Sequence, residues 1–133
     1  MNTSNKEKYS KELIKAIKEW KENWYKDWKS LRLDRKNISL YDLIFRICIA
    51  MNIKGKKAPT ISEGEKYSYW YELEMIMIDR NNPSIISMLH EFAHHLYGHD
   101  EIKAQLWASE LFKKCFLKDF KKLKWENELL IKI

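Results

Sequence analysis

The four histidines of the chain all lie between positions 90 and 99. His90 and His94 are four residues apart, so on an α-helix their imidazoles stand one turn apart on the same face. Two imidazoles at this spacing can bind one zinc ion, each at about 2.0–2.1 Å. Glu91 is rotated by roughly 100° from His90, beside the ion, where it can take a proton from zinc-bound water. The sequence HEFAH therefore has the HExxH arrangement, in which the glutamate is a general base.

A catalytic zinc site needs a third protein ligand and one position left open for water. Four residues after the second histidine are candidates: His95, His99, Glu101 and Glu110. His95 is turned roughly 100° from His94, toward solvent. His99 does not fit the pattern HExxHxxGxxH, because here the glycine comes one residue late and the histidine one residue early.

Glu101 is the third ligand that the helical pattern favours. The segment after it has an inner stripe of small and apolar residues, whose two alanines allow close approach to a neighbouring helix: Ala104, Ala108, Leu111 and Cys115. Glu101 projects toward this stripe, whereas Glu110 points to roughly the opposite side. We therefore expect His90, His94 and Glu101 to bind Zn²⁺. The alternative for Glu101 is a carboxylate that interacts only with the helix dipole.

The histidine motif lies on a predicted amphipathic helix. Asn82-Pro83-Ser84 marks its start, and Gly98 provides its end after Tyr97. Its apolar stripe has helical spacing and leaves both histidines at the edge of that stripe: Ile85, Leu89, Phe92, Ala93 and Leu96. Asp100 then suits the N-cap of a second helix that reaches about Phe120.

The N-terminal part is predicted to be helical and to precede a small sheet. Residues 9–33 form one long amphipathic helix with an apolar stripe: Leu13, Ile17, Trp20, Trp24, Trp28 and Leu31. A second helix begins at Ser39, with Asp42 completing a capping box, and buries Leu40, Leu43, Ile44, Ile47 and Met51. Residues 57–79 form a small antiparallel sheet with a turn near Gly64, because side chains alternate there with a period of two.

These elements predict a single α+β domain over residues 1–133. Long N-terminal helices occupy residues 1–53, and a small, mostly antiparallel sheet occupies 54–80. The active-site helix and a glutamate helix fall within 82–120, and 121–133 is a tail of unassigned conformation.

The composition bears on partners and location. The chain has 25 Lys and Arg against 19 Asp and Glu, a net charge of +6. These charges are interspersed, which is typical of solvated helix faces, so nucleic acid is a possible partner but not the favoured one. Cys48 and Cys115 are far apart, which indicates buried thiols in a reducing compartment. We expect no signal peptide and no membrane insertion, hence a cytoplasmic protein; the oligomeric state stays open.

HEFAH at 90–94 followed by EIKAQ at 101–105 resembles the HExxH plus ExxA(D) signature of the gluzincin metallopeptidases. In its short length and single small predicted sheet, the chain resembles the minigluzincins. Those proteins are similar to the catalytic domains of membrane-bound CAAX-type zinc proteases. The resemblance implies a zincin-like fold and a zinc-dependent endopeptidase with Glu91 as general base and Glu101 as third ligand. It also implies a latent, zymogen-like form, for which the terminal ENELLIKI is a candidate inhibitory segment. Gln105 stands where the family usually has Asp.

Two other interpretations stay open. The first is a DNA-associated HExxH protease or regulator of the SprT or ImmA/IrrE kind, which the positive charge and the aromatic N-terminal helix would suit. The second is a non-catalytic metal-binding module. The residue that would stabilise the oxyanion is also open among Tyr97, His95 and His99.

Overall fold

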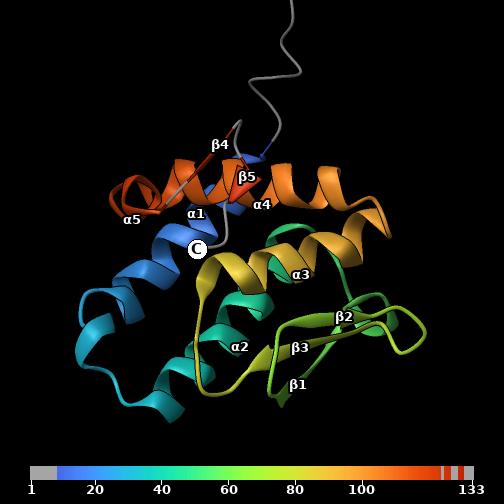
Figure 1. Ribbon diagram of the computed structural model, residues 1–133, viewed down its shortest axis with the longest axis horizontal. Coiled ribbons are helices and arrows are strands. Elements are labelled where there is room, and N and C mark those ends of the chain that lie inside the picture. The colour runs from blue at the N-terminus through green and yellow to red at the C-terminus, as the bar shows by residue number, and fades with distance from the viewer. Residues whose placement is uncertain (1–8, 124, 127–128, 131–133) are drawn as a thin grey trace, which may run out of the picture. The chain divides into compact units, whose positions relative to one another are not determined.

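The computed structural model describes residues 9–123, 125–126 and 129–130 of the chain, which divides into two compact units, residues 1–58 and 59–133 (Figure 1). Five α-helices, a three-stranded mixed sheet and a two-stranded hairpin make up the regular structure of these described residues, together with shorter helical turns. The α+β class is therefore confirmed. The prediction of a single domain stays a prediction, and the two units are described in turn.

The first unit begins with α1 (Lys11–Trp20), which Ser10 caps by accepting a hydrogen bond from the Leu13 amide at 3.1 Å. The prediction of one regular helix over 9–33 is wrong. After Trp20 the chain continues as a π-helical turn, Lys21–Tyr25, and a 3₁₀ turn, Trp28–Ser30. The Tyr25 ring of the π-helical turn and the Trp28 ring of the 3₁₀ turn both pack against Trp20, with centroids 6.0 and 5.9 Å away.

Helix α2 (Leu33–Ala50) begins well before the predicted start at Ser39. Ser39 is fully buried inside the helix, where its hydroxyl donates to the Lys36 carbonyl at 2.6 Å and its carbonyl accepts the Trp20 indole N–H at 2.7 Å. The capping box with Asp42 is therefore wrong, because both polar groups of Ser39 are used within the packed helix pair. The predicted inner face is confirmed for four of its five residues, with Met51 half-buried: Leu40, Leu43, Ile44 and Ile47. A 3₁₀ turn, Gly55–Lys57, follows.

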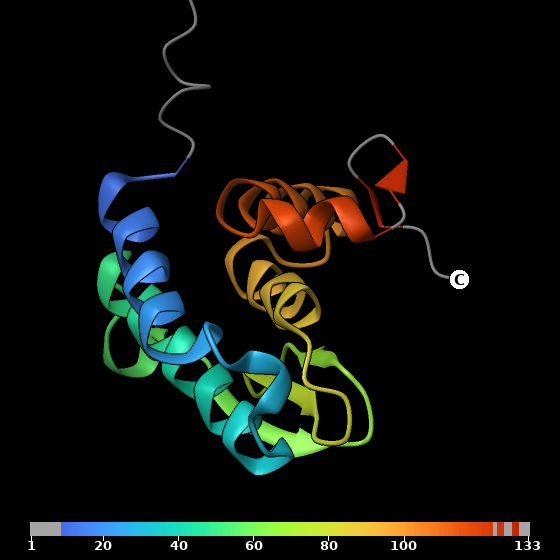
Figure 2. The same ribbon diagram turned by 90° about the vertical axis from the view of Figure 1, so that its left-hand side faces the viewer.

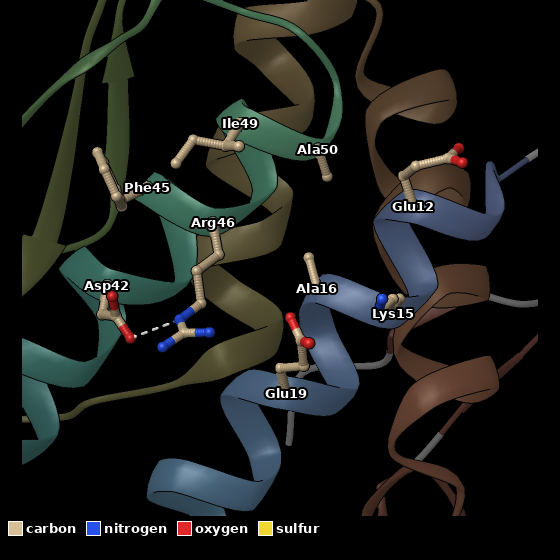
Figure 3. Close-up of a pocket in the computed structure, with 9 residues that line it drawn as sticks. All are labelled: Glu12, Lys15, Ala16, Glu19, Asp42, Phe45, Arg46, Ile49 and Ala50. Carbon is tan, nitrogen blue, oxygen red and sulfur yellow. Dashed lines mark hydrogen bonds and ion pairs between the residues drawn. The ribbon is translucent and has the colours of Figure 1, made fainter.

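An open groove of about 510 Å³ lies between α1 and α2 (Figure 3). Its apolar wall includes Phe45 and Ile49, which are 64% and 62% exposed. On the same helix, Arg46 donates to Asp42 at 2.9 Å. The lining residues include neither histidine nor cysteine: Glu12, Lys15, Ala16, Glu19, Asp42, Phe45, Arg46, Ile49 and Ala50. The groove is therefore not part of the predicted metal site.

The second unit opens with a sheet of three strands, β1 (Thr60–Gly64), β2 (Ser68–Trp70) and β3 (Met75–Asp79), in the order β1-β3-β2. Strand β2 pairs antiparallel with β3, but β1 pairs parallel with it. The sheet is where it was predicted, yet it is mixed and not mostly antiparallel. The part of the segment 57–79 that contains β2 and β3 is not one continuous strand. The chain turns at 71–74, where Glu74 has φ +48°.

Helix α3 (Ile85–Tyr97) has the predicted limits. Ser84 accepts a hydrogen bond from the Ser87 amide at 3.2 Å, and Gly98 ends the helix with φ +71°. Helix α4 (Glu101–Cys115) starts as predicted, with Asp100 accepting from the Lys103 amide at 3.0 Å.

The end of the second predicted helix differs from the prediction. Helix α4 stops at Cys115, and a separate helix α5 (Leu117–Lys122) follows. Phe116, with φ −133°, breaks the helix; its ring is buried and stacks on Phe112 at 5.1 Å. The break lets Phe116 reach the core.

Helix α3 lies between the sheet and α4, as both views show (Figures 1 and 2). Small and apolar side chains of these elements are almost completely buried: Ile76, Leu89, Phe92, Ala93, Ala104 and Ala108. The buried alanines let α4 approach α3 closely. This close packing positions the first turn of α4 beside the last two turns of α3.

Beyond α5, strands β4 (Trp125–Glu126) and β5 (Leu129–Leu130) form an antiparallel hairpin, with β5 next to α4. The predicted inhibitory segment is 126–133, of which residues 127–128 and 131–133 lie outside the described residues. Within the described part of the chain, no helix has both the length and the hydropathy that crossing a bilayer requires.

Candidate metal centre

Three side chains of the second unit meet at the α3–α4 interface. Nε2 of His90 lies 2.8 Å from Oε2 of Glu101, and Nε2 of His94 lies 2.8 Å from Oε1 of the same carboxylate. One ligand atom from each of the three residues lies within 4.8 Å of the others. The structure therefore brings together the three residues that the sequence predicted as ligands.

Local structure explains this meeting. His90 and His94 face the same way from α3, with ring centroids 4.9 Å apart and planes at 76°. Only 98–100 separate α3 from α4, so Glu101 occupies the first turn of the returning helix. Asp100, as N-cap, fixes where that turn begins.

The site is closed on one side and open on the other. The side chains of His94 and His90 are 8% and 16% exposed, whereas that of Glu101 is 65% exposed. The imidazoles thus form a buried floor, and the carboxylate faces solvent. An ion bound by these three side chains would therefore lie at the surface of the unit, on the side where Glu101 faces solvent.

The hydrogen bonds of His94 determine its tautomer. Nδ1 lies 2.7 Å from the carbonyl oxygen of Gly98 and 2.9 Å from the hydroxyl of Tyr71. A carbonyl can only accept, so Nδ1 carries a proton, and a neutral ring then has its lone pair on Nε2. Glu101 is also an acceptor and lies 2.8 Å from Nε2, so the two groups would repel unless a second proton or a metal ion lies between them.

His90 favours the neutral form that metals bind. Burial lowers the pKa of its imidazole, and the neighbouring His94 adds to this, while Glu101 and the Gln105 side chain act in the opposite direction. Gln105 is thus close enough to influence the ring. It does not satisfy Nδ1, however, which is buried and has no hydrogen-bond partner among the described residues.

Glu91 is half-buried on α3, next to His90 in the sequence. The pKa of the Tyr71 hydroxyl is raised by burial and further by the charges of Glu91 and Glu101. Both carboxylates therefore lie within electrostatic range of Tyr71, which itself contacts His94. This is consistent with Glu91 lying beside the cluster and not within it.

The other candidate ligands lie outside the cluster. His95 was expected to face solvent, but it is half-buried, and its Nδ1 is hydrogen-bonded to the hydroxyl of Tyr69 at 2.6 Å. His99 is exposed and stacks on the ring of Tyr71, with centroids 3.7 Å apart. Glu110 is on α4 but is not part of the cluster.

Two residues near the cluster were missed as site residues. Tyr69 and Tyr71 fall within the segment 57–79, which was predicted only as a small sheet, yet both bond histidines of α3. Their spacing of two indicates that the two rings lie on one face of an extended segment, but not that this face contacts α3. Tyr97, an expected candidate for the oxyanion, instead packs its ring near Trp107 and under the Lys103 ammonium.

Comparisons of the chain with models of protein families, with curated proteins and with solved structures found no match. The likeness of HEFAH and EIKAQ to the gluzincin signature is therefore an expectation from the sequence alone.

Proposed function

We propose that this chain is a zinc-dependent endopeptidase with a zincin-like site, in which His90, His94 and Glu101 hold the metal. One observation carries the proposal: a single carboxylate presents one oxygen to each of two Nε2 atoms, at 2.8 Å in both cases. At His94 this happens while Nδ1 is already committed to the Gly98 carbonyl. A cation between these atoms would remove the repulsion.

The donor set fits zinc better than the alkaline-earth ions. Two imidazole nitrogens and one carboxylate oxygen are the three protein ligands of one known kind of catalytic zinc site. Magnesium and calcium prefer oxygen ligands throughout. Because Glu101 is exposed on one side, an ion bound here would be accessible to substrate, as a catalytic site requires and a closed structural site does not.

The reaction would divide the work between the ion and Glu91. When bound, the zinc ion supplies Lewis-acid chemistry, polarising the scissile carbonyl and lowering the pKa of the attacking water. Glu91 accepts a proton from that water and passes it to the leaving amine. The half-buried position of Glu91 beside His90 suits this role.

A peptide or protein substrate would bind along β2. This strand is at the edge of the three-stranded sheet and carries Tyr69, which contacts His95 of α3. An extended peptide can pair its backbone with such an edge and so lie across the end of α3. We therefore include β2 in the substrate site, and we place the enzyme in the cytoplasm.

Metal analysis of three proteins tests the proposal. The wild-type chain and Glu110→Ala, which removes the other carboxylate of α4, should each bind one zinc ion. Glu101→Ala should lose at least about tenfold in affinity. Wild-type hydrolysis of a fluorescent casein should stop with EDTA and return with zinc. Equal zinc affinity in Glu101→Ala and the wild type would disprove the ligand set.

One observation favours a second candidate, a nucleic-acid-associated protease. Residues 1–58 contain 15 Lys and Arg against 7 Asp and Glu, a net +8, whereas 59–133 contain 10 against 12, a net −2. Such asymmetry is typical of chains with a polyanion-binding part. A mobility shift with DNA that weakens steeply between 50 and 200 mM salt would support this candidate. If no shift is seen at 50 mM salt, nucleic acid is excluded as a partner and the proposal of a peptidase alone remains.

A further inference from the structure

Tyr69 of β2 and Tyr71, the first residue of the turn after β2, bond two adjacent histidines of α3. The hydroxyl of Tyr69 lies 2.6 Å from Nδ1 of His95, and that of Tyr71 lies 2.9 Å from Nδ1 of His94. The two tyrosine rings are in edge contact, with centroids 4.9 Å apart. Two tyrosine–histidine hydrogen bonds thus connect this segment to α3, and one of the two histidines, His94, is a predicted zinc ligand.

Contacts other than the bond to His94 also hold Tyr71 in place. Its hydroxyl also donates to the Gly98 carbonyl at 3.2 Å, the same oxygen that lies 2.7 Å from Nδ1 of His94. Its ring stacks on His99 with planes at 25°. Three polar atoms therefore form a closed triangle on the side of His94 that faces away from Glu101.

We propose that Tyr71 is a positioning residue for His94: together with the Gly98 carbonyl, its hydroxyl holds the imidazole so that Nε2 points at the metal site. Zinc ligands usually have such a partner on the other ring nitrogen, often a carboxylate. Here a tyrosine and a backbone carbonyl take that place. The inference rests on the proposed metal site.

The two histidine ligands are consequently held unequally. Nδ1 of His94 has two partners, whereas the buried Nδ1 of His90 has none among the described residues. Gln105, which approaches the His90 ring, leaves that atom unsatisfied. Among the described residues, Tyr71 and Gly98 thus hold the far ring nitrogen of His94, and no equivalent pair holds that of His90.

Tyr71→Phe tests the inference, and Tyr69→Phe is its matched control. Each variant removes one hydroxyl from an equivalent tyrosine–histidine bond, but only Tyr71 acts on a ligand. Zinc affinity is measured by competition with a chromogenic chelator, and the visible absorption spectrum of bound Co²⁺ reports the ligand arrangement. Urea unfolding of the metal-free proteins measures how much each hydroxyl contributes to the fold.

We expect Tyr71→Phe to lose about 10- to 100-fold in zinc affinity and to alter the Co²⁺ spectrum. Tyr69→Phe should keep both while losing a similar free energy of unfolding. Wild-type affinity in Tyr71→Phe would overturn the inference, as would equal losses in the two variants, since both tyrosines would then serve only the fold. If the wild-type chain itself binds no metal, the proposed function fails and the inference with it.

Discussion

Oε1 of Glu101 lies 2.8 Å from Nε2 of His94, although the two residues belong to different helices. The contact is possible because only 98–100 connect α3 to α4, so the chain reverses within one short turn. The candidate centre is therefore contained in the stretch from His90 to Glu101. Its chemistry depends on local geometry and on how firmly the two helices are held together.

Replacing Glu91 by Gln should abolish hydrolysis and leave metal binding intact. The amide cannot accept a proton from water, and loss of general-base catalysis typically costs about 10²- to 10⁴-fold in rate. Casein cleavage and zinc content are measured on the same sample, with Glu110→Gln as a control for the change of charge. Cleavage by Glu91→Gln at the wild-type rate would show that another residue is the base.

Zinc should stabilise the second unit, because its ligands come from both α3 and α4. A ligand that binds only the folded state at 100 times its dissociation constant adds about 2.7 kcal/mol. Urea denaturation with zinc and with EDTA measures the difference. Glu101→Ala should show little of it, and an unchanged wild-type midpoint upon zinc addition would contradict the centre.

Gly98→Ala should weaken both the fold and the metal site. Gly98 has φ +71° and ψ −142°, a conformation that residues with a side chain adopt only at a cost of about 1–3 kcal/mol. Any relaxation of this strain moves the carbonyl that bonds His94. Urea unfolding and zinc titration give the two effects, and a variant with wild-type values of both would mean that the backbone here is not constrained.

Cys48 should be unreactive in the native protein. Burial raises the pKa of its thiol from 9.0 to about 11, so at pH 8 the group is protonated as well as shielded. The free energy of unfolding is highest, as far as this thiol is concerned, below pH 9. It falls as the pH rises from 9 through about 11, because the thiol ionises in the unfolded chain before it ionises in the folded one. Reaction with DTNB at pH 8, with and without urea, measures this in a Cys115→Ala background; rapid native labelling would contradict it.

Removing 126–133 should raise peptidase activity if the chain is latent, as its resemblance to the minigluzincins implies. Strand β5, which belongs to this segment, lies beside α4, the helix that carries Glu101. Casein hydrolysis by the truncated and complete chains is compared after circular dichroism has shown that both are folded. Equal rates would exclude inhibition by this segment.

The parts of the fold that short-range signals determine were predictable. Ser84, Gly98 and Asp100 are capping residues next to strongly periodic segments, and α3 and the start of α4 begin and end where they indicated. Ser39 looked like the same kind of signal and misled, because the Trp20 indole, nineteen residues away, bonds its carbonyl inside a helix. The parallel pairing of β1 with β3 also depends on long-range contacts that no local pattern records.

The site divides in the same way. The meeting of His90, His94 and Glu101 followed from helical spacing and one short turn. The contact of Tyr71 with His94 could not be predicted, because it depends on how β2 packs against α3. The solvent-facing orientation predicted for His95 failed for the same reason, since Tyr69 covers it.

With Glu101 two-thirds exposed, an incoming ion would meet the carboxylate before the imidazoles, and α3 and α4 would not have to separate. Departure would follow the same route in reverse. The breaking of coordination bonds, and not opening of the helix pair, would then limit the residence time. Occupancy would follow the buffered zinc concentration of the surroundings, so a cell could load or empty this centre without unfolding the protein.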